Sequence, residues 1–295
     1  MKTRNRRHLA EFLLATVTIF WGATFPIVKE AIEEVPVLCF LWVRFLFAAI
    51  LLALFAGPKG FATLNKEGYL KGIFLGVLLF ASYITQTYGL SLTTSSNTGF
   101  LTGLNVVWVS LLAGPILKKP PAPGAKIGVV CAVAGLFMLT WQGSFSINPG
   151  DALVSLCAFF VALHILGLDA LTKGYDGRAL AFVQIMTMAV LGAIGSYFFE
   201  PVSWPRVWSS SLIWALIITA VFATTYAFWV QTTFQKWTTP TRAALIYTLE
   251  PVFAAVFSIW LLSEKLSTIG WIGGALIVCG MVVAEALPAR KPKST

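Results

Sequence analysis

Long apolar runs, separated by short polar breaks, follow one another along the chain. No Asp, Glu, Lys or Arg occurs in residues 72–117, 127–150, 179–199 or 207–235. A membrane-spanning helix needs about 20 predominantly apolar residues, so each run is long enough for one or two spans. The pattern predicts an all-α polytopic membrane protein with ten transmembrane helices, at about 10–29, 37–56, 71–91, 97–117, 126–143, 150–170, 179–199, 209–232, 241–262 and 268–287.

The positions of the basic residues predict the orientation of these helices. Of the 21 Lys and Arg residues, seventeen fall in the two tails or in the turns after even-numbered helices, and only three fall in the opposite turns. Basic residues gather on the cytoplasmic side of membrane proteins, so we expect both termini in the cytoplasm. The net charge of +9 is then a topology signal, and we expect no nucleic acid as partner.

The two halves of the chain resemble each other at a shift of 145 residues. The shift places NTGFLTGLNVVWVSLL (97–112) on RAALIYTLEPVFAAVF (242–257), and it places Gln86, Gly128 and Gly135 on Gln231, Gly273 and Gly280. Each half holds five predicted helices, and because five is odd the second copy enters the membrane from the opposite side. Such inverted repeats place a substrate site near the midplane. We expect one repeat over 10–143, a second over 150–287, and short basic cytoplasmic tails over 1–9 and 288–295.

Two ionisable residues lie deep in the predicted spans, where a charge costs roughly 2.5–3.5 kcal/mol. Arg44 lies in the second helix and Glu250 near the middle of the ninth. The repeat pairs Glu250 with Asn105, and a shift of 140 pairs Arg44 with Gln184. We expect all four to face a central cavity, with Arg44 on an anionic group and Glu250 as a substrate ligand or proton site. A structural, snorkelling Arg44 and a permanent Arg44–Glu250 pair are the alternatives.

Further polar and aromatic residues follow helical spacing on the same spans. Thr102 and Asn105 share one face of the fourth helix, and Phe228 and Gln231 share one face of the eighth. These stripes predict a cavity wall, whereas hydrogen bonds between packed helices are the other interpretation. The additional candidate cavity residues are Gln86, Gln231, Thr102, Trp21, Phe25, Tyr83, Phe228, Tyr247 and His164.

Prolines within two predicted spans indicate helix bends. Pro26 lacks the N–H that would bond to the Gly22 carbonyl, and Pro251 likewise leaves the Tyr247 carbonyl without its helical partner. Gly22 also removes a side chain beside the freed carbonyl. We predict a bend at Gly22 and Pro26 that faces the cavity, and a similar bend at Pro251 beside Glu250; a static kink for packing is the alternative.

These motifs are similar to a known family. WGATFP (21–26), Arg44 and the block LEPVFAAVFSIWLLSEKLSTIGWIGGALIVCGMVV (249–283) resemble the EamA-type transporters of the drug/metabolite transporter superfamily. The first half departs from the pattern, with Asn105 and Val106 in place of Glu-Pro. The resemblance implies ten helices, a cavity lined by helices 1–4 and 6–9, and export of small metabolites, often amino acids or amphipathic compounds, across a bacterial inner membrane.

The sequence favours a secondary transporter over other membrane proteins. We find no nucleophile–base pair and no metal-ligand cluster, so we expect no enzymatic activity, no metal and no cofactor. A channel, or a lipid-handling or scaffold protein without coupled transport, is the alternative; bulky residues interrupt the polar stripes, which disfavours a channel. The expected partners are a small-molecule solute, the lipid bilayer and protons as coupling ion, in a monomer or weak homodimer.

Overall fold

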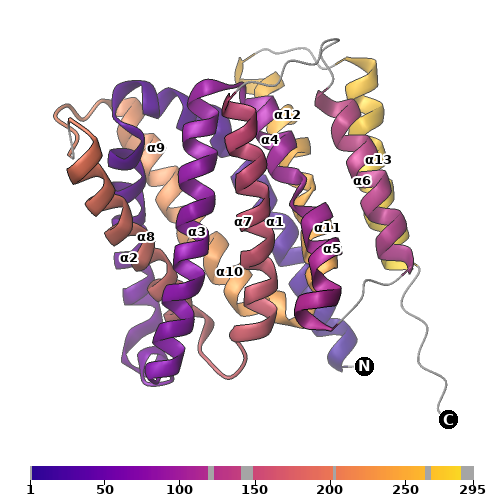
Figure 1. Ribbon diagram of the computed structural model, residues 1–295, viewed down its shortest axis with the longest axis horizontal. Helices are drawn as coiled ribbons and strands as arrows, with labels where there is room; N and C mark the ends of the chain where they lie inside the picture. The colour runs from indigo at the N-terminus through magenta and orange to yellow at the C-terminus, as the bar shows by residue number, and fades with distance from the viewer. Residues whose placement is uncertain (1, 119–122, 141–148, 202–203, 263–266, 287–295) are drawn as a thin grey trace.

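The computed structural model describes residues 2–118, 123–140, 149–201, 204–262 and 267–286. Within these ranges the chain is helical and contains no strand. The helices run alongside one another as a bundle, with α6 and α13 at one edge, and α1 begins at the end of the bundle where α13 ends (Figure 1). The predicted tail over 288–295 and the repeat boundaries at 143 and 287 lie outside the described residues.

The helices of the first half are α1 (Lys2–Glu34), α2 (Val37–Phe61), α3 (Lys66–Leu92), α4 (Ser95–Gly103), α5 (Asn105–Leu117) and α6 (Pro123–Thr140). Those of the second half are α7 (Pro149–Leu171), α8 (Gly177–Phe199), α9 (Ser210–Ala220), the π-helix η1 (Val221–Tyr226), α10 (Ala227–Phe234), the 3₁₀-helix η2 (Gln235–Trp237), α11 (Pro240–Tyr247), α12 (Leu249–Leu262) and α13 (Thr268–Ala286). Each of the ten predicted stretches therefore contains helix.

Seven helical stretches of the described residues are long and apolar enough to cross a membrane. They are Asn5–Glu34, Val37–Phe61, Lys66–Leu92, Thr98–Leu117, Pro149–Leu171, Gly177–Phe199 and Ser210–Trp237. Two shorter apolar helices are Pro123–Met138 and Thr268–Gly280. An integral membrane protein is thus supported, whereas the crossing of the membrane by all ten stretches stays a prediction.

Some helices extend beyond their apolar runs. We expected the first helix over 10–29, but α1 continues as one helix from Lys2 to Glu34, through Pro26. The added turns consist largely of Lys, Arg and Glu, which are good helix formers, and Glu11 anchors the first turns because its Oε1 accepts a hydrogen bond of 2.8 Å from Thr238 Oγ1. The second helix also runs further than expected, to Phe61, but with a kink at Gly57, where φ is 60°.

Two predicted helices are each interrupted at a single residue, although that residue keeps a right-handed helical conformation. The fourth breaks at Leu104, between α4 and α5, and the ninth breaks at Thr248, between α11 and α12. At each break a side chain donates to the carbonyl three residues earlier: Asn105 Nδ2 to the Thr102 oxygen at 2.8 Å, and Thr248 Oγ1 to the Leu245 oxygen at 2.6 Å. Such bonds offer the backbone an alternative to the regular helical pattern. They accompany the two breaks but do not cause them alone, because Thr18 and Ser82 make the same bond within the uninterrupted helices α1 and α3.

Two helices approach each other closely at glycines. A Cβ on Gly135 would lie 2.5 Å from the Gly273 oxygen, and a Cβ on Gly280 would lie 2.9 Å from the Gly128 oxygen. Only glycine permits backbones to approach so closely. These contacts join α6 to α13. They are also reciprocal, because Gly135 corresponds to Gly280 in the repeat and Gly273 corresponds to Gly128. Extensive contacts also join α2 to α8 and α3 to α7.

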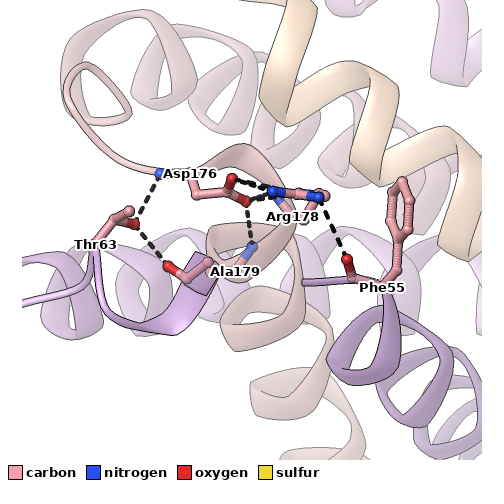
Figure 2. Close-up of polar contacts among 6 residues, drawn as sticks. Phe55, Thr63, Asp176, Arg178 and Ala179 are labelled. Carbon is pink, nitrogen blue, oxygen red and sulfur yellow. Dashed lines mark hydrogen bonds and ion pairs between the residues drawn. The ribbon is translucent and has the colours of Figure 1, made fainter. Parts of the chain in front are cut away.

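The turn between α7 and α8 is fastened to the turn after α2. Figure 2 shows the carboxylate of Asp176 against the guanidinium of Arg178, with a shortest distance of 2.8 Å, while the Asp176 amide donates to Thr63 Oγ1 at 3.0 Å. The Asp176 carboxylate also accepts from the backbone N–H groups of Arg178 and Ala179 and so caps α8. The hydrogen bond from the Arg178 guanidinium, aided by these amides, lowers the pKa of Asp176.

Candidate functional site

A central cavity lies where the two halves of the chain meet. It encloses about 750 Å³ of space, part of it open to solvent, and residues of α1, α2, α3, α4, α5, α7, α10, α11 and α12 form its wall. Twelve of the thirteen predicted cavity residues line it: Trp21, Phe25, Arg44, Tyr83, Gln86, Thr102, Asn105, His164, Phe228, Gln231, Tyr247 and Glu250. Charged, polar and aromatic side chains of both halves therefore line one cavity.

Arg44 is held by α2 within the wall of the cavity and is only 3% exposed. Its Nε donates to Thr224 Oγ1 at 2.9 Å, and its Cζ lies 5.3 Å from the centre of the Tyr83 ring. No carboxylate of the described residues lies within 4.0 Å of the guanidinium. The positive charge is therefore oriented by a hydroxyl and an aromatic face, and it remains available to an anionic group of a ligand.

The hydroxyl that orients Arg44 belongs to the π-helix η1. Thr224 Oγ1 donates to the Thr219 carbonyl, five residues earlier, at 2.8 Å, and so its oxygen accepts from Arg44. One residue before Thr224, the Ala223 carbonyl accepts a hydrogen bond of 3.0 Å from Trp21 Nε1. Short π-helices often occur at functional sites. Here η1 fixes one charged and one aromatic residue of the cavity.

Glu250 is the second residue of α12 and lies on the same cavity, 8% exposed. Among the described residues, no Lys, Arg or His forms an ion pair with it, so Arg44 and Glu250 do not pair in this structure. Behind Glu250, a Cβ on Gly22 would lie 2.7 Å from the Glu250 backbone oxygen. Gly22 thus allows α1 to pack directly on the backbone that carries this carboxylate.

Gln184 is the predicted residue that does not line the cavity; it lies behind His164. His164 Nε2 and Gln184 Oε1 are 2.8 Å apart, and Gln184 Nε2 donates to the Leu180 carbonyl at 3.2 Å. Because a carbonyl only accepts, the amide nitrogen must face Leu180, and His164 must then donate from Nε2. Gln184 therefore fixes the tautomer of His164, which leaves Nδ1 as an acceptor while the imidazole is neutral.

Aromatic rings form the apolar part of the site. The Trp21 ring lies 5.4 Å from that of Tyr247 and 5.9 Å from that of Phe228, centre to centre. The Tyr247 hydroxyl donates to Gln235 Oε1 at 3.2 Å, and Gln235 Nε2 donates to the Ile165 carbonyl at 2.8 Å. These bonds satisfy the Tyr247 hydroxyl, so its ring contributes an apolar surface.

The structure also adds residues that our list of candidates omitted. Thr24, Ser82, Thr87 and Cys157 line the cavity. The sequence carried a signal for Cys157, because it precedes His164 by seven residues and therefore shares its helix face. The bend residues Gly22, Pro26 and Pro251 do not line the cavity, and their role in bending stays a prediction. Among the described residues, no group of three or more His, Cys, Asp and Glu residues is arranged to hold a metal ion.

Both halves of the chain are similar to a family of transporters. The model of the EamA-like transporter family matches residues 8–141 and 148–285. An uncharacterized transporter of Archaeoglobus fulgidus is 31% identical over 284 residues, which cover 95% of this chain and 87% of that relative. The uncharacterized transporter YoaV of Bacillus subtilis is 25% identical over 278 residues, which cover 90% of this chain and 92% of YoaV.

A solved crystal structure has the same fold. It superimposes with a TM-score of 0.77 at 19% sequence identity and covers 94% of this chain and 96% of its own. The similarity therefore extends over both halves of the chain.

Proposed function

Because this chain belongs to the EamA-like transporter family, we propose that it is a secondary transporter that moves a small amphipathic or zwitterionic solute across the inner membrane. One observation carries the proposal: a single cavity between the halves holds a buried Arg44 and a buried Glu250 that do not neutralise each other. Two separated opposite charges suit a carboxylate and an amine on one ligand, and the Trp21–Tyr247 aromatic surface suits its apolar part.

Alternating access between two inverted repeats is the proposed mechanism. The family model matches the chain twice, and the reciprocal contacts of Gly135 and Gly280 join the two halves as a pseudo-two-fold relation requires. The breaks at Leu104 and Thr248 likewise lie within one residue of equivalent places in the repeats. Broken helices at a repeat interface supply ligand groups in transporters of this architecture. The basic residues favour ten crossings with both termini in the cytoplasm.

Glu250 is also the proposed coupling site. A proton and a protonated amine compete for the same carboxylate, so binding of one releases the other, and exchange follows from the competition. Glu250→Gln keeps the size of the side chain but cannot ionise. In proteoliposomes this variant should lose substrate-driven proton flux and the pH dependence of exchange; retention of both would exclude the coupling role.

The experiment that tests the transporter function is solute counterflow. Purified protein is first screened by thermal shift against amino acids, amines and carboxylates, and the stabilising compounds are then loaded into proteoliposomes. Saturable uptake that is accelerated by internal unlabelled solute supports a transporter. Non-saturable conductance would instead support the channel alternative.

A further inference from the structure

Asn105 carries an unused hydrogen-bond acceptor in the cavity wall. The residue is 2% exposed, and its Nδ2 donates to the Thr102 carbonyl at 2.8 Å. Because that carbonyl only accepts, a flipped amide would place two oxygens against each other, so the orientation of the amide is fixed. Asn105 Oδ1 is thereby left buried without a partner. An unsatisfied buried acceptor destabilises the fold and calls for a donor from outside the chain.

Two other groups that line the same cavity share the chemistry of this acceptor. Gln231 Oε1, on the same cavity, is also buried without a partner, and Glu250 contributes a carboxylate. The two helix breaks that carry Asn105 and Glu250 touch each other, since a Cβ on Gly103 would lie 3.6 Å from Pro251 Cγ. Two neutral oxygens and one carboxylate, none with a proton donor from the described chain, are the complement of a group with several N–H donors and a positive charge.

We propose that Asn105 Oδ1 and the Glu250 carboxylate, completed by Gln231 Oε1, form a subsite that recognises a primary ammonium group by its three N–H donors. The inference rests on the proposed function, because it names the part of the solute that this side of the cavity selects. Glu250 supplies a negative charge. The two amide oxygens accept hydrogen bonds, and so they distinguish ligands by the number of N–H donors. Replacing N–H by N–CH₃ keeps the charge and removes a donor, so the subsite discriminates against methylated amines.

The test uses a ligand series that changes only the number of N–H donors. Binding of phenylalanine and its N-methyl, N,N-dimethyl and N,N,N-trimethyl derivatives to the purified full chain is measured by calorimetry. We expect the first methyl group to weaken binding about tenfold, as for the loss of one charge-assisted hydrogen bond. In Asn105→Leu, phenylalanine should itself bind more weakly, and the step to N-methylphenylalanine should shrink to about twofold.

Two further variants separate recognition from folding. Gln231→Met alters neither residue that donates at a helix break and should also shrink the methylation step. Thr98→Val removes a hydroxyl that donates to the Thr94 carbonyl and does not line the cavity, so it should leave the step unchanged. A purely steric penalty would persist at full size in Asn105→Leu and Gln231→Met and would overturn the subsite.

The remaining outcomes distinguish this inference from the proposed function. Equal affinity for phenylalanine and its trimethyl derivative would mean recognition by charge alone, with the amide oxygens holding water; the subsite would fail and the transporter would stand. The consequence would be the same if 3-phenylpropanoate, which lacks the ammonium group, bound and exchanged in counterflow while phenylalanine did neither. Failure of every compound in counterflow would overturn the zwitterion transporter, and the subsite with it.

Discussion

The two broken helices occupy equivalent places in the repeats but are built from different residues. At the first break the chain has Asn105 and Val106, and at the second it has Glu250 and Pro251. The helix breaks in both halves although only one has a proline, and α1 remains a helix through Pro26. A proline is therefore not required for a break. The feature common to both breaks is a polar side chain that donates to the carbonyl three residues earlier.

This difference leaves the two breaks with different chemistry. In the first half, Asn105 itself supplies the donor to the backbone, so its amide is fixed and its oxygen is left without a partner. In the second half, Thr248 supplies that donor, so Glu250 remains free to bind a ligand or a proton. A symmetrical pair of helices thereby gives an asymmetrical site, with one neutral acceptor and one carboxylate, which sets the orientation of a charged solute.

The largest effect should come from making the second break chemically like the first. Glu250→Asn removes the carboxylate but keeps a polar side chain, and counterflow of the best solute should fall about 100-fold, as for the truncation of one partner in a buried charge pair. Glu67→Gln, which alters the acid that pairs with Lys71 at 2.6 Å near the start of α3, is the matched control and should have no effect. Wild-type exchange by Glu250→Asn would show that the asymmetry is unimportant.

The second prediction concerns the support behind the carboxylate. A Cβ on Gly22 would lie 2.7 Å from both the Ala254 nitrogen and the Glu250 oxygen, so Gly22→Ala forces α1 away from α12. The free energy of unfolding should fall by about 1–3 kcal/mol, as for other overpacked contacts. Gly114→Ala meets no atom within 4 Å and should be neutral or stabilising. Equal thermal stability of the two variants would contradict the close contact.

Part of this arrangement is visible in the sequence. The apolar runs predict helices at the right places, and the repeat predicts that Asn105 and Glu250 occupy equivalent positions. Polar residues at helical spacing also predict which faces line the cavity, because a polar side chain in lipid is costly unless it faces protein or water.

The remaining features depend on contacts between distant segments. No proline beside Leu104 predicts the break there. The orientation of Arg44 depends on Thr224, which lies 180 residues later within a π-helix. Gln184 shares the polarity of the cavity residues but lies behind His164, because the helix face that it occupies is set by packing between α7, α8 and α10. Periodicity identifies a face of a helix, whereas tertiary packing decides what that face meets.

The third prediction concerns Pro251, the residue that most clearly distinguishes the second break from the first. Pro251→Ala restores the N–H that the Tyr247 carbonyl lacks, and a proline-based account would expect a continuous helix with severely impaired transport. Since the first half breaks with Val106 at the equivalent place, we expect the second break to persist. Counterflow should stay within about threefold of wild type, and amides near Thr248 should still exchange with solvent faster than those in the middle of α12.

The smallest effect should come from an acid whose partner is fixed, in contrast to Glu250. Asp176, which lies just before the stretch Gly177–Phe199, pairs with Arg178, and this pairing lowers the pKa of Asp176 in the folded protein. The stabilisation is therefore complete above the ordinary Asp pKa of about 3.9 and is lost as the pH falls through the lower folded value. Asp176→Asn should lower the free energy of unfolding by less than about 1 kcal/mol at neutral pH. Because the variant has no carboxylate to protonate, its stability should fall less than that of the wild type between pH 6 and pH 3. Counterflow should be unchanged. If Asp176→Asn impaired transport as strongly as Glu250→Asn, the distinction between a fixed acid that holds two turns together and a free acid that binds the solute would not hold.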